Sequence, residues 1–83
     1  MSNTRIASAL RELIESRPDP VPLPPPAERR ALRVLGNTTQ RELGQIIGTS
    51  RAAVTRYEGG TREPRGDTRR RYAEVLEVLR RGL

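Results

Sequence analysis

The feature that most constrains this chain is a close series of helix-capping residues in its middle. Thr39 and Glu42 form a Thr-x-x-Glu capping box, which satisfies free N–H groups at the start of a helix. Gly48 can adopt the left-handed conformation that ends a helix in a tight turn. Ser50 can then cap a second helix directly after that turn. The spacing predicts two short consecutive helices joined by one tight turn.

The apolar residues of these two helices, expected at about 39–47 and 50–58, recur on one face of each. Gly44 lies on that face, and it favours an unusually close helix crossing, since glycine otherwise costs a helix roughly 0.5–1 kcal/mol relative to alanine. The residues expected to point inward are Leu43, Ile46, Ile47, Ala53, Val54 and Tyr57. Those expected to point outward from the second helix are Arg51, Ala52, Thr55 and Arg56.

The N-terminal third of the chain is organised differently. Residues 3–16 have apolar residues at helical spacing, which indicates an amphipathic helix. Residues 18–26 are mostly proline, which predicts an extended, polyproline-like connector. We therefore expect an N-terminal amphipathic helix within 1–17, a connector at 18–26 and a helical domain at 27–83. The apolar stripe of the first helix comprises Ile6, Leu10, Leu13 and Ile14.

Two further helices complete the predicted domain. One spans residues 27–35, with Pro26 suited to its first turn. The other begins with Asp67 as its cap and runs to about Arg81. No window alternates at period two, so the predicted fold is all-α, a compact domain of four to five short helices plus the N-terminal amphipathic helix. The stripe expected to be buried on the final helix is Tyr72, Val75, Leu76 and Leu79.

The distribution of charge indicates an anionic partner for one half of the chain. The net charge is +6 and every cation is arginine, which a GC-rich genome would also produce. Residues 1–26 carry three arginines and three acids, whereas residues 27–83 carry thirteen arginines and seven acids, so 13 − 7 = +6. The whole excess therefore lies on the capped-helix half, where a polyanion would bind.

Composition excludes several other functions. The chain has no cysteine and no histidine, which removes disulfides, thiolate metal sites and the commonest general base. We therefore expect no enzyme activity, no metal and no cofactor. No apolar run approaches the roughly 18 residues of a membrane span, and no signal peptide is evident. We expect a cytoplasmic protein with no membrane partner and no small-molecule ligand.

The segment QRELGQIIGTSRAAVTRYEGGTREP resembles the helix-turn-helix of XRE-type bacterial regulators, which include lambdoid phage repressors and Cro proteins. The resemblance extends over about residues 29–64. It implies a lambda-repressor-like fold and sequence-specific binding to double-stranded DNA. The implied function is a transcriptional regulator, a repressor acting as a homodimer on an inverted-repeat operator. Two alternatives stay open: an excision accessory or architectural protein, and an antitoxin-like module whose N-terminal helix binds another protein.

The resemblance also implies roles for particular residues. An arginine fork suits guanine, whose O6 and N7 can accept two hydrogen bonds, although contact with phosphate alone is the alternative for both arginines of the second helix. The positions that correspond to base-reading residues are Arg51, Ala52, Thr55 and Arg56. Those that correspond to contacts with the DNA backbone are Gln40, Ser50, Arg62 and Arg65. Arg33 and Glu58 correspond to a structural ion pair.

Two positions depart from the family pattern. Arg29 stands where an apolar residue is usual in the first helix, and Thr38 stands where leucine is common. The core is therefore expected to lack apolar volume there, and the N-terminal helix or Val21 and Leu23 would cover the gap. The run Arg69-Arg70-Arg71 opposes the dipole of its own helix, which either a contact with DNA or plain solvation would explain.

Overall fold

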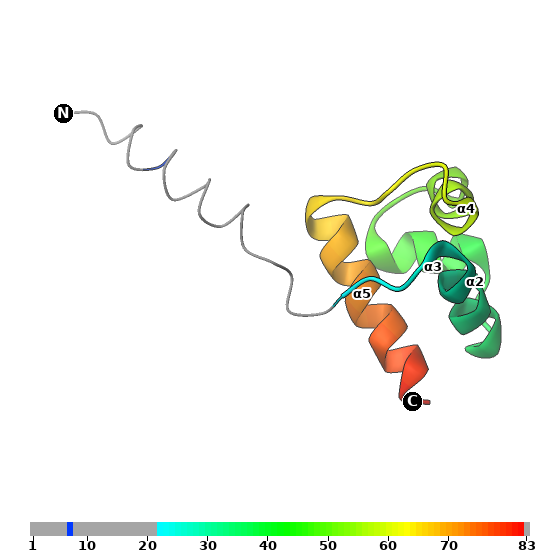
Figure 1. Cartoon of the computed structure of the whole chain (residues 1–83). Coiled ribbons are helices and arrows are strands. Elements are labelled where there is room, and N and C mark those ends of the chain that lie inside the picture. The colour runs from blue at the N-terminus through cyan, green and yellow to red at the C-terminus, as the bar shows by residue number, and fades with distance from the viewer. Residues whose placement is uncertain (1–6, 8–21, 83) are drawn as a thin grey trace.

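The computed structural model describes Ala7 and residues 22–82, and residues 22–82 form four helices without a strand. The expected N-terminal helix and Val21 lie outside the described residues, apart from Ala7. Because residues 22–82 are helical and contain no strand, the all-α prediction is confirmed. Figure 1 shows α4 and the C-terminus at opposite ends of the domain. The helices are α2 (Pro26–Leu35), α3 (Gln40–Ile47), α4 (Arg51–Gly59) and α5 (Gly66–Arg80).

The predicted caps are present at the turn between α3 and α4. The Thr39 hydroxyl accepts from the Glu42 N–H at 3.0 Å, and the Thr39 N–H donates to the Glu42 carboxylate at 2.9 Å. That backbone hydrogen bond lowers the pKa of Glu42 below its usual value. Gly48 adopts a left-handed φ of 79°, and the Ser50 hydroxyl accepts from the Ala53 N–H at 3.1 Å. The sequence thus specifies both ends of the turn.

Two local predictions were wrong. Asp67 does not cap α5, because the helix begins at Gly66 and Arg65 occupies the cap position without a side-chain hydrogen bond. Asp67 instead lies in the first turn, where a carboxylate also suits the helix dipole, and it pairs with Arg70 at 2.7 Å. Ile46 is 54% exposed, since the buried face of α3 is centred on its neighbour Ile47 and excludes it.

A small apolar core joins the four helices. The side chains of Tyr57 and Tyr72 lie in contact within it, with ring centroids 5.7 Å apart, and Leu23 packs against it from the segment before α2. Burial raises the pKa of the Tyr72 hydroxyl, which therefore stays protonated. The largest fully buried side chains are Tyr72, Leu43, Ile47, Leu76 and Val54.

Gly44 allows α3 to approach the start of α4 closely. A Cβ atom at this position would lie 2.8 Å from the backbone oxygen of Thr49 and 3.2 Å from the carbonyl carbon of Ser50. Both obstacles are backbone atoms, so neither can rotate away. Backbone contact therefore explains why a residue that weakens the helix stands here.

Arg29 fills the position at which an apolar gap was expected. It is 4% exposed, and its guanidinium donates to the carbonyl oxygens of Pro24 at 2.7 Å and of Tyr57 at 3.1 Å. Two further bonds, at 3.1 and 2.9 Å, reach the carboxylate of Glu63. The expectation of a missing apolar residue was wrong, because a long side chain whose three guanidinium nitrogens are all hydrogen-bonded replaces that volume.

Arg33 and Glu58 form an ion pair that is largely buried on both sides. The Arg33 Nε donates to Glu58 at 2.5 Å and its Nη2 at 3.0 Å, while Nη1 donates to the carbonyl oxygen of Thr38 at 2.9 Å. The Arg33 and Glu58 side chains are 11% and 3% exposed. The hydrogen bond to Glu58 raises the pKa of Arg33. The pair joins α2 to the end of α4.

Replacing Gly44 with alanine should destabilise the protein. The new methyl group would displace the backbone at Thr49, at a cost of about 1–3 kcal/mol that outweighs the gain in helix propensity. Gly59→Ala is the matched control, since a Cβ there meets nothing within 4 Å. It should stabilise the protein by about 0.4–1 kcal/mol. Urea unfolding compares the two, and a stabilised Gly44→Ala variant would contradict the close approach.

Removing Arg33 should cost considerably more than removing a surface arginine. Arg33→Ala leaves the buried Glu58 carboxylate without its cation, and the expected loss is about 3–5 kcal/mol of unfolding free energy. Arg30→Ala on the exposed side of the same helix should stay within about 0.5 kcal/mol of wild type. Chemical denaturation measures both. Equal effects of the two variants would show that the buried pair does not hold α4.

Candidate nucleic-acid interface

The residues expected to contact bases share one exposed face of α4. Arg51, Ala52, Thr55 and Arg56 are all exposed, and the i, i+1, i+4, i+5 spacing places them side by side. The opposite face of α4 buries Ala53, Val54, Tyr57 and Glu58 in the domain. The helix therefore presents a polar, cationic surface on a backbone fixed from behind.

Gln40 links this face to the start of α3. Its side-chain nitrogen donates to Glu58 at 3.1 Å, and its side-chain oxygen accepts from the Thr55 hydroxyl at 2.9 Å. Gln40 and Arg51 line one shallow pocket of about 490 Å³ together with Arg33. Residues expected to bind the DNA backbone and residues expected to read bases therefore meet at this corner of the domain.

Sequence reasoning missed the contact between Gln40 and Thr55. The two residues lie on different helices, and their distance depends on how closely α3 and α4 cross. Gly44, which sets that crossing, was the only indication in the sequence. Ser50, another residue expected at the backbone, is exposed, and its hydroxyl oxygen caps α4.

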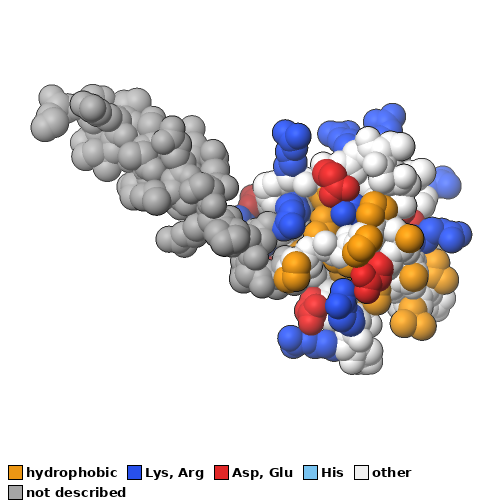
Figure 2. Space-filling view, viewed as in Figure 1, with side chains coloured by type: hydrophobic (Ala, Val, Ile, Leu, Met, Phe, Trp, Pro, Cys, Tyr) orange, Lys and Arg blue, Asp and Glu red, His pale blue; other side chains and the backbone are white. Residues whose placement is uncertain are grey.

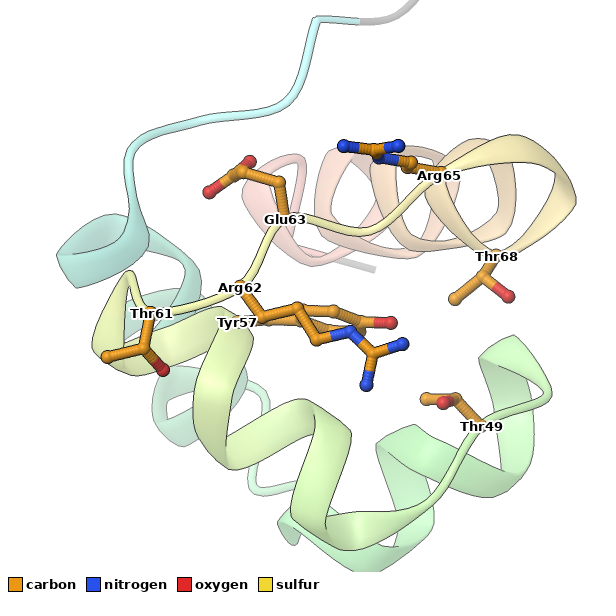
Figure 3. A pocket seen from close by; sticks show the side chains of 7 residues that line it. All are labelled: Thr49, Tyr57, Thr61, Arg62, Glu63, Arg65 and Thr68. Carbon is orange, nitrogen blue, oxygen red and sulfur yellow. The ribbon is translucent and has the colours of Figure 1, made fainter.

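The loop after α4 presents two arginines beside a polar pocket of about 660 Å³. Figure 3 shows the Arg62 guanidinium and the Tyr57 hydroxyl directed toward the space beside Thr49 and Thr68, while Glu63 points away from it. Arg62 and Arg65 are both exposed. The residues that line the pocket are Thr49, Tyr57, Thr61, Arg62, Glu63, Arg65 and Thr68.

The ion pair of Glu63 with Arg29 holds this loop, and sequence reasoning missed that role of Arg29. Glu63 is the one carboxylate that lines the pocket, and its two hydrogen bonds to Arg29 neutralise it. Because Glu63 is occupied, the remaining charge at the pocket is that of Arg62 and Arg65. The start of α5, which has no side-chain cap, adds the positive end of a helix dipole. The pocket is therefore suited to an anion.

Arginine side chains project from several sides of the domain. Figure 2 shows them at the top and right of the domain and also at its lower end, while apolar side chains gather at lower right. The run Arg69-Arg70-Arg71 was expected either to contact DNA or to be solvated. Within it, Arg70 pairs with Asp67. A Cβ atom added at Gly48 would lie 2.8 Å from a guanidinium nitrogen of Arg71. Arg71 thus packs over the turn between α3 and α4.

The described residues contain neither a cluster of metal ligands nor a membrane-spanning helix. Among Ala7 and residues 22–82, no group of three histidine, cysteine or acidic side chains is placed to hold a metal ion. Over the same residues, no helix has the length and apolar character needed to cross a bilayer.

Comparison with known proteins agrees with this geometry. A family model described as Helix-turn-helix matches residues 30–81, more than half of the 83-residue chain. The match includes α3, the turn, α4 and the arginine loop. No curated protein and no solved structure matches the chain. With capped helices, a cationic outer face and this match, the chain belongs to the XRE-type helix-turn-helix family of DNA-binding regulators.

Proposed function

We propose that this protein is a sequence-specific transcriptional regulator, a repressor that binds an inverted-repeat operator in double-stranded DNA as a homodimer. The observation that carries the proposal is the exposed face of α4, which displays Arg51, Ala52, Thr55 and Arg56 on a helix anchored by its buried side. A protruding helix of this size fits the major groove, which is about 12 Å wide. A protein bound there would exclude RNA polymerase from an overlapping promoter.

Base recognition is assigned to the outer face of α4. Arg51 and Arg56 each carry a planar fork that can donate two hydrogen bonds to O6 and N7 of guanine. The methyl groups of Ala52 and Thr55 can contact the methyl group of thymine. Within the described residues no hydrogen bond or ion pair joins either arginine side chain to the protein, so both forks are available to DNA.

Backbone contacts flank the recognition helix on both sides. Gln40 uses one amide hydrogen for Glu58 and keeps a second, which can donate to a phosphate oxygen. On the other side, Arg62 and Arg65 border the polar pocket, where a phosphate would meet two cations and the start of α5. These contacts would position the protein without selecting a sequence.

Selection of bound sequences from random DNA tests this division of roles. Arg51→Ala or Arg56→Ala should weaken binding to the selected operator by about 1–3 kcal/mol and relax preference at one or two base pairs. Arg62→Ala and Arg65→Ala should weaken binding to all sequences alike and lower the salt dependence by about one phosphate each. If both α4 variants kept the wild-type sequence preference, α4 would not be the reading helix.

An apolar groove on another part of the domain supports the homodimer. It has a volume of about 400 Å³, and exposed Val78 and Ile46 line it near Leu35, which is 80% exposed. None of the proposed DNA-contacting residues lines the groove. A two-fold dimer pairs one patch with its own copy, and this surface offers both a groove and projecting apolar side chains. Two joined recognition helices would then cover both halves of an inverted repeat.

The groove can be tested with two adjacent residues of α3. Ile46→Asp places a carboxylate in the groove, whereas Gln45→Asp makes the same change in charge at an exposed neighbour that does not line it. Ile46→Asp should abolish dimerisation and weaken operator binding, and Gln45→Asp should preserve both. Sedimentation at tens of micromolar measures the assembly state. A wild-type monomer, free and on its operator, would rule out the homodimer.

A further inference from the structure

Tyr57 contributes a hydroxyl group to the polar pocket beside the arginine loop. Only 4% of the residue is exposed, and its side chain lines this pocket of about 660 Å³. Figure 3 shows the hydroxyl directed toward the space beside Thr49 and Thr68. Within the described residues, the hydroxyl makes no hydrogen bond to the protein. Because polar groups on buried residues normally have a partner, this donor indicates a ligand in the pocket.

The core of the domain fixes the position of the Tyr57 hydroxyl. The ring lies against that of Tyr72, with centroids 5.7 Å apart and the ring planes at 39°. The backbone is held as well, since Arg29 donates to the Tyr57 carbonyl oxygen at 3.1 Å. The hydroxyl oxygen lies on the axis of the ring, so a ring flip does not move it. A donor held in this way loses little freedom when a ligand binds.

The groups around this hydroxyl suit an anion with several acceptor oxygens. Figure 3 shows the Arg62 guanidinium directed toward the same space, while Glu63 points away from it. Glu63 is also hydrogen-bonded to Arg29, at 3.1 and 2.9 Å. Thr49 and Thr68 add two further hydroxyl groups to the lining. A cation and several neutral donors around one space match the oxygens of a phosphate group.

We infer that the Tyr57 hydroxyl donates a hydrogen bond to a phosphate of the DNA backbone that enters this pocket. The inference rests on the proposed function. It adds a rigid donor from the core to the two proposed contacts from the loop, Arg62 and Arg65. Tyr57 belongs to α4 itself, whereas the two arginines follow that helix. A phosphate bound by Tyr57 would therefore fix the position of α4 directly against one DNA strand.

The two stacked tyrosines provide a matched test. Tyr57→Phe and Tyr72→Phe each remove one hydroxyl and keep the ring. The Tyr72 hydroxyl is buried without a hydrogen bond among the described residues, and Tyr72 does not line the pocket. Tyr57→Phe should weaken binding to the selected operator and to unrelated DNA alike by about tenfold, the value of a hydrogen bond to a charged group. Tyr72→Phe should leave both affinities unchanged. Fluorescence anisotropy of labelled DNA measures them.

The salt dependence of binding separates the hydroxyl from the arginines. Tyr57→Phe removes no charge, so the slope of log affinity against log salt concentration should stay at the wild-type value while the affinity falls. Arg62→Ala should instead lower this slope by about one phosphate. Both variants should keep the wild-type sequence preference, because contacts with phosphate carry no information about the bases.

Methylphosphonate linkages locate the phosphate, because each replaces one charged phosphate oxygen with a methyl group. In a scan along the operator, the effect of Tyr57→Phe should disappear at one linkage, since the hydroxyl and that oxygen form a single interaction. Inorganic phosphate added without DNA tests a free anion as the ligand instead. In that case phosphate would raise the unfolding temperature of the wild type and not of Tyr57→Phe, and the two proteins would bind DNA equally.

The inference is overturned if Tyr57→Phe binds all DNA with wild-type affinity, or if the two phenylalanine variants weaken binding equally. A Tyr57→Phe variant that unfolds would also overturn it, since the hydroxyl would then be bonded within the protein. A wild type that binds DNA without selecting a sequence would overturn the proposed regulator, while unrelated DNA would still test the contact of Tyr57. A wild type that binds no DNA would overturn both.

Discussion

The buried carboxylate of Glu58 is the group on which the arrangement of α4 depends. A buried charge is costly unless cations and donors surround it. Its partners come from two other helices, Arg33 from α2 and Gln40 from α3. The Glu58 carboxylate therefore ties α4 to both α2 and α3 at one point. Apolar contacts provide most of the driving force, and this polar contact fixes the geometry.

The end of α4 is held by two guanidinium groups. Arg33 binds Glu58, and Arg29 donates to the carbonyl oxygen of Tyr57, the preceding residue. Positive charge at this end of a helix also complements its dipole. Arg29 extends the same support to the following loop through Glu63. Both guanidinium contacts thus lie at the C-terminal end of α4, while Ala53 and Val54 bury its N-terminal half through apolar contacts.

Local chemistry made much of this fold predictable from the sequence. The Thr39–Glu42 box and Gly48 specify a turn through neighbouring residues, and the structure has both. Asp67 was misplaced because an acid is favourable both at a cap and in the first turn. Ile46 was misplaced because apolar residues on a short helix do not show which of them faces the core. These errors concern choices that only packing decides.

The residues of the candidate site could be predicted from the sequence, but the hydrogen bonds that join them could not. The outward face of α4 follows from helical periodicity. The bonds of Gln40 to Thr55 and Glu58 join positions 15 and 18 residues apart, so they depend on the crossing of α3 and α4. From the sequence, Arg29 was expected to leave the core short of apolar volume. Its partners Pro24 and Glu63 lie in two separate loops, so the sequence did not show that they would pair with it. A sequence pattern cannot show which distant acceptors a buried guanidinium will meet.

The contacts of α4 divide the exposed residues proposed to contact DNA into two physical kinds. Thr55 is held by a network that extends through Gln40 and buried Glu58 to Arg33, so its orientation is already set in the free protein. Arg51 and Arg56 are long, exposed side chains, and each would lose rotamer freedom on ordering in the proposed complex with DNA. A preset group discriminates between bases because it cannot turn to suit a mismatch. Flexible arginines can exchange a base edge for a nearby phosphate. The orientation of Thr55 therefore depends on contacts with Gln40, Glu58 and Arg33 within the protein.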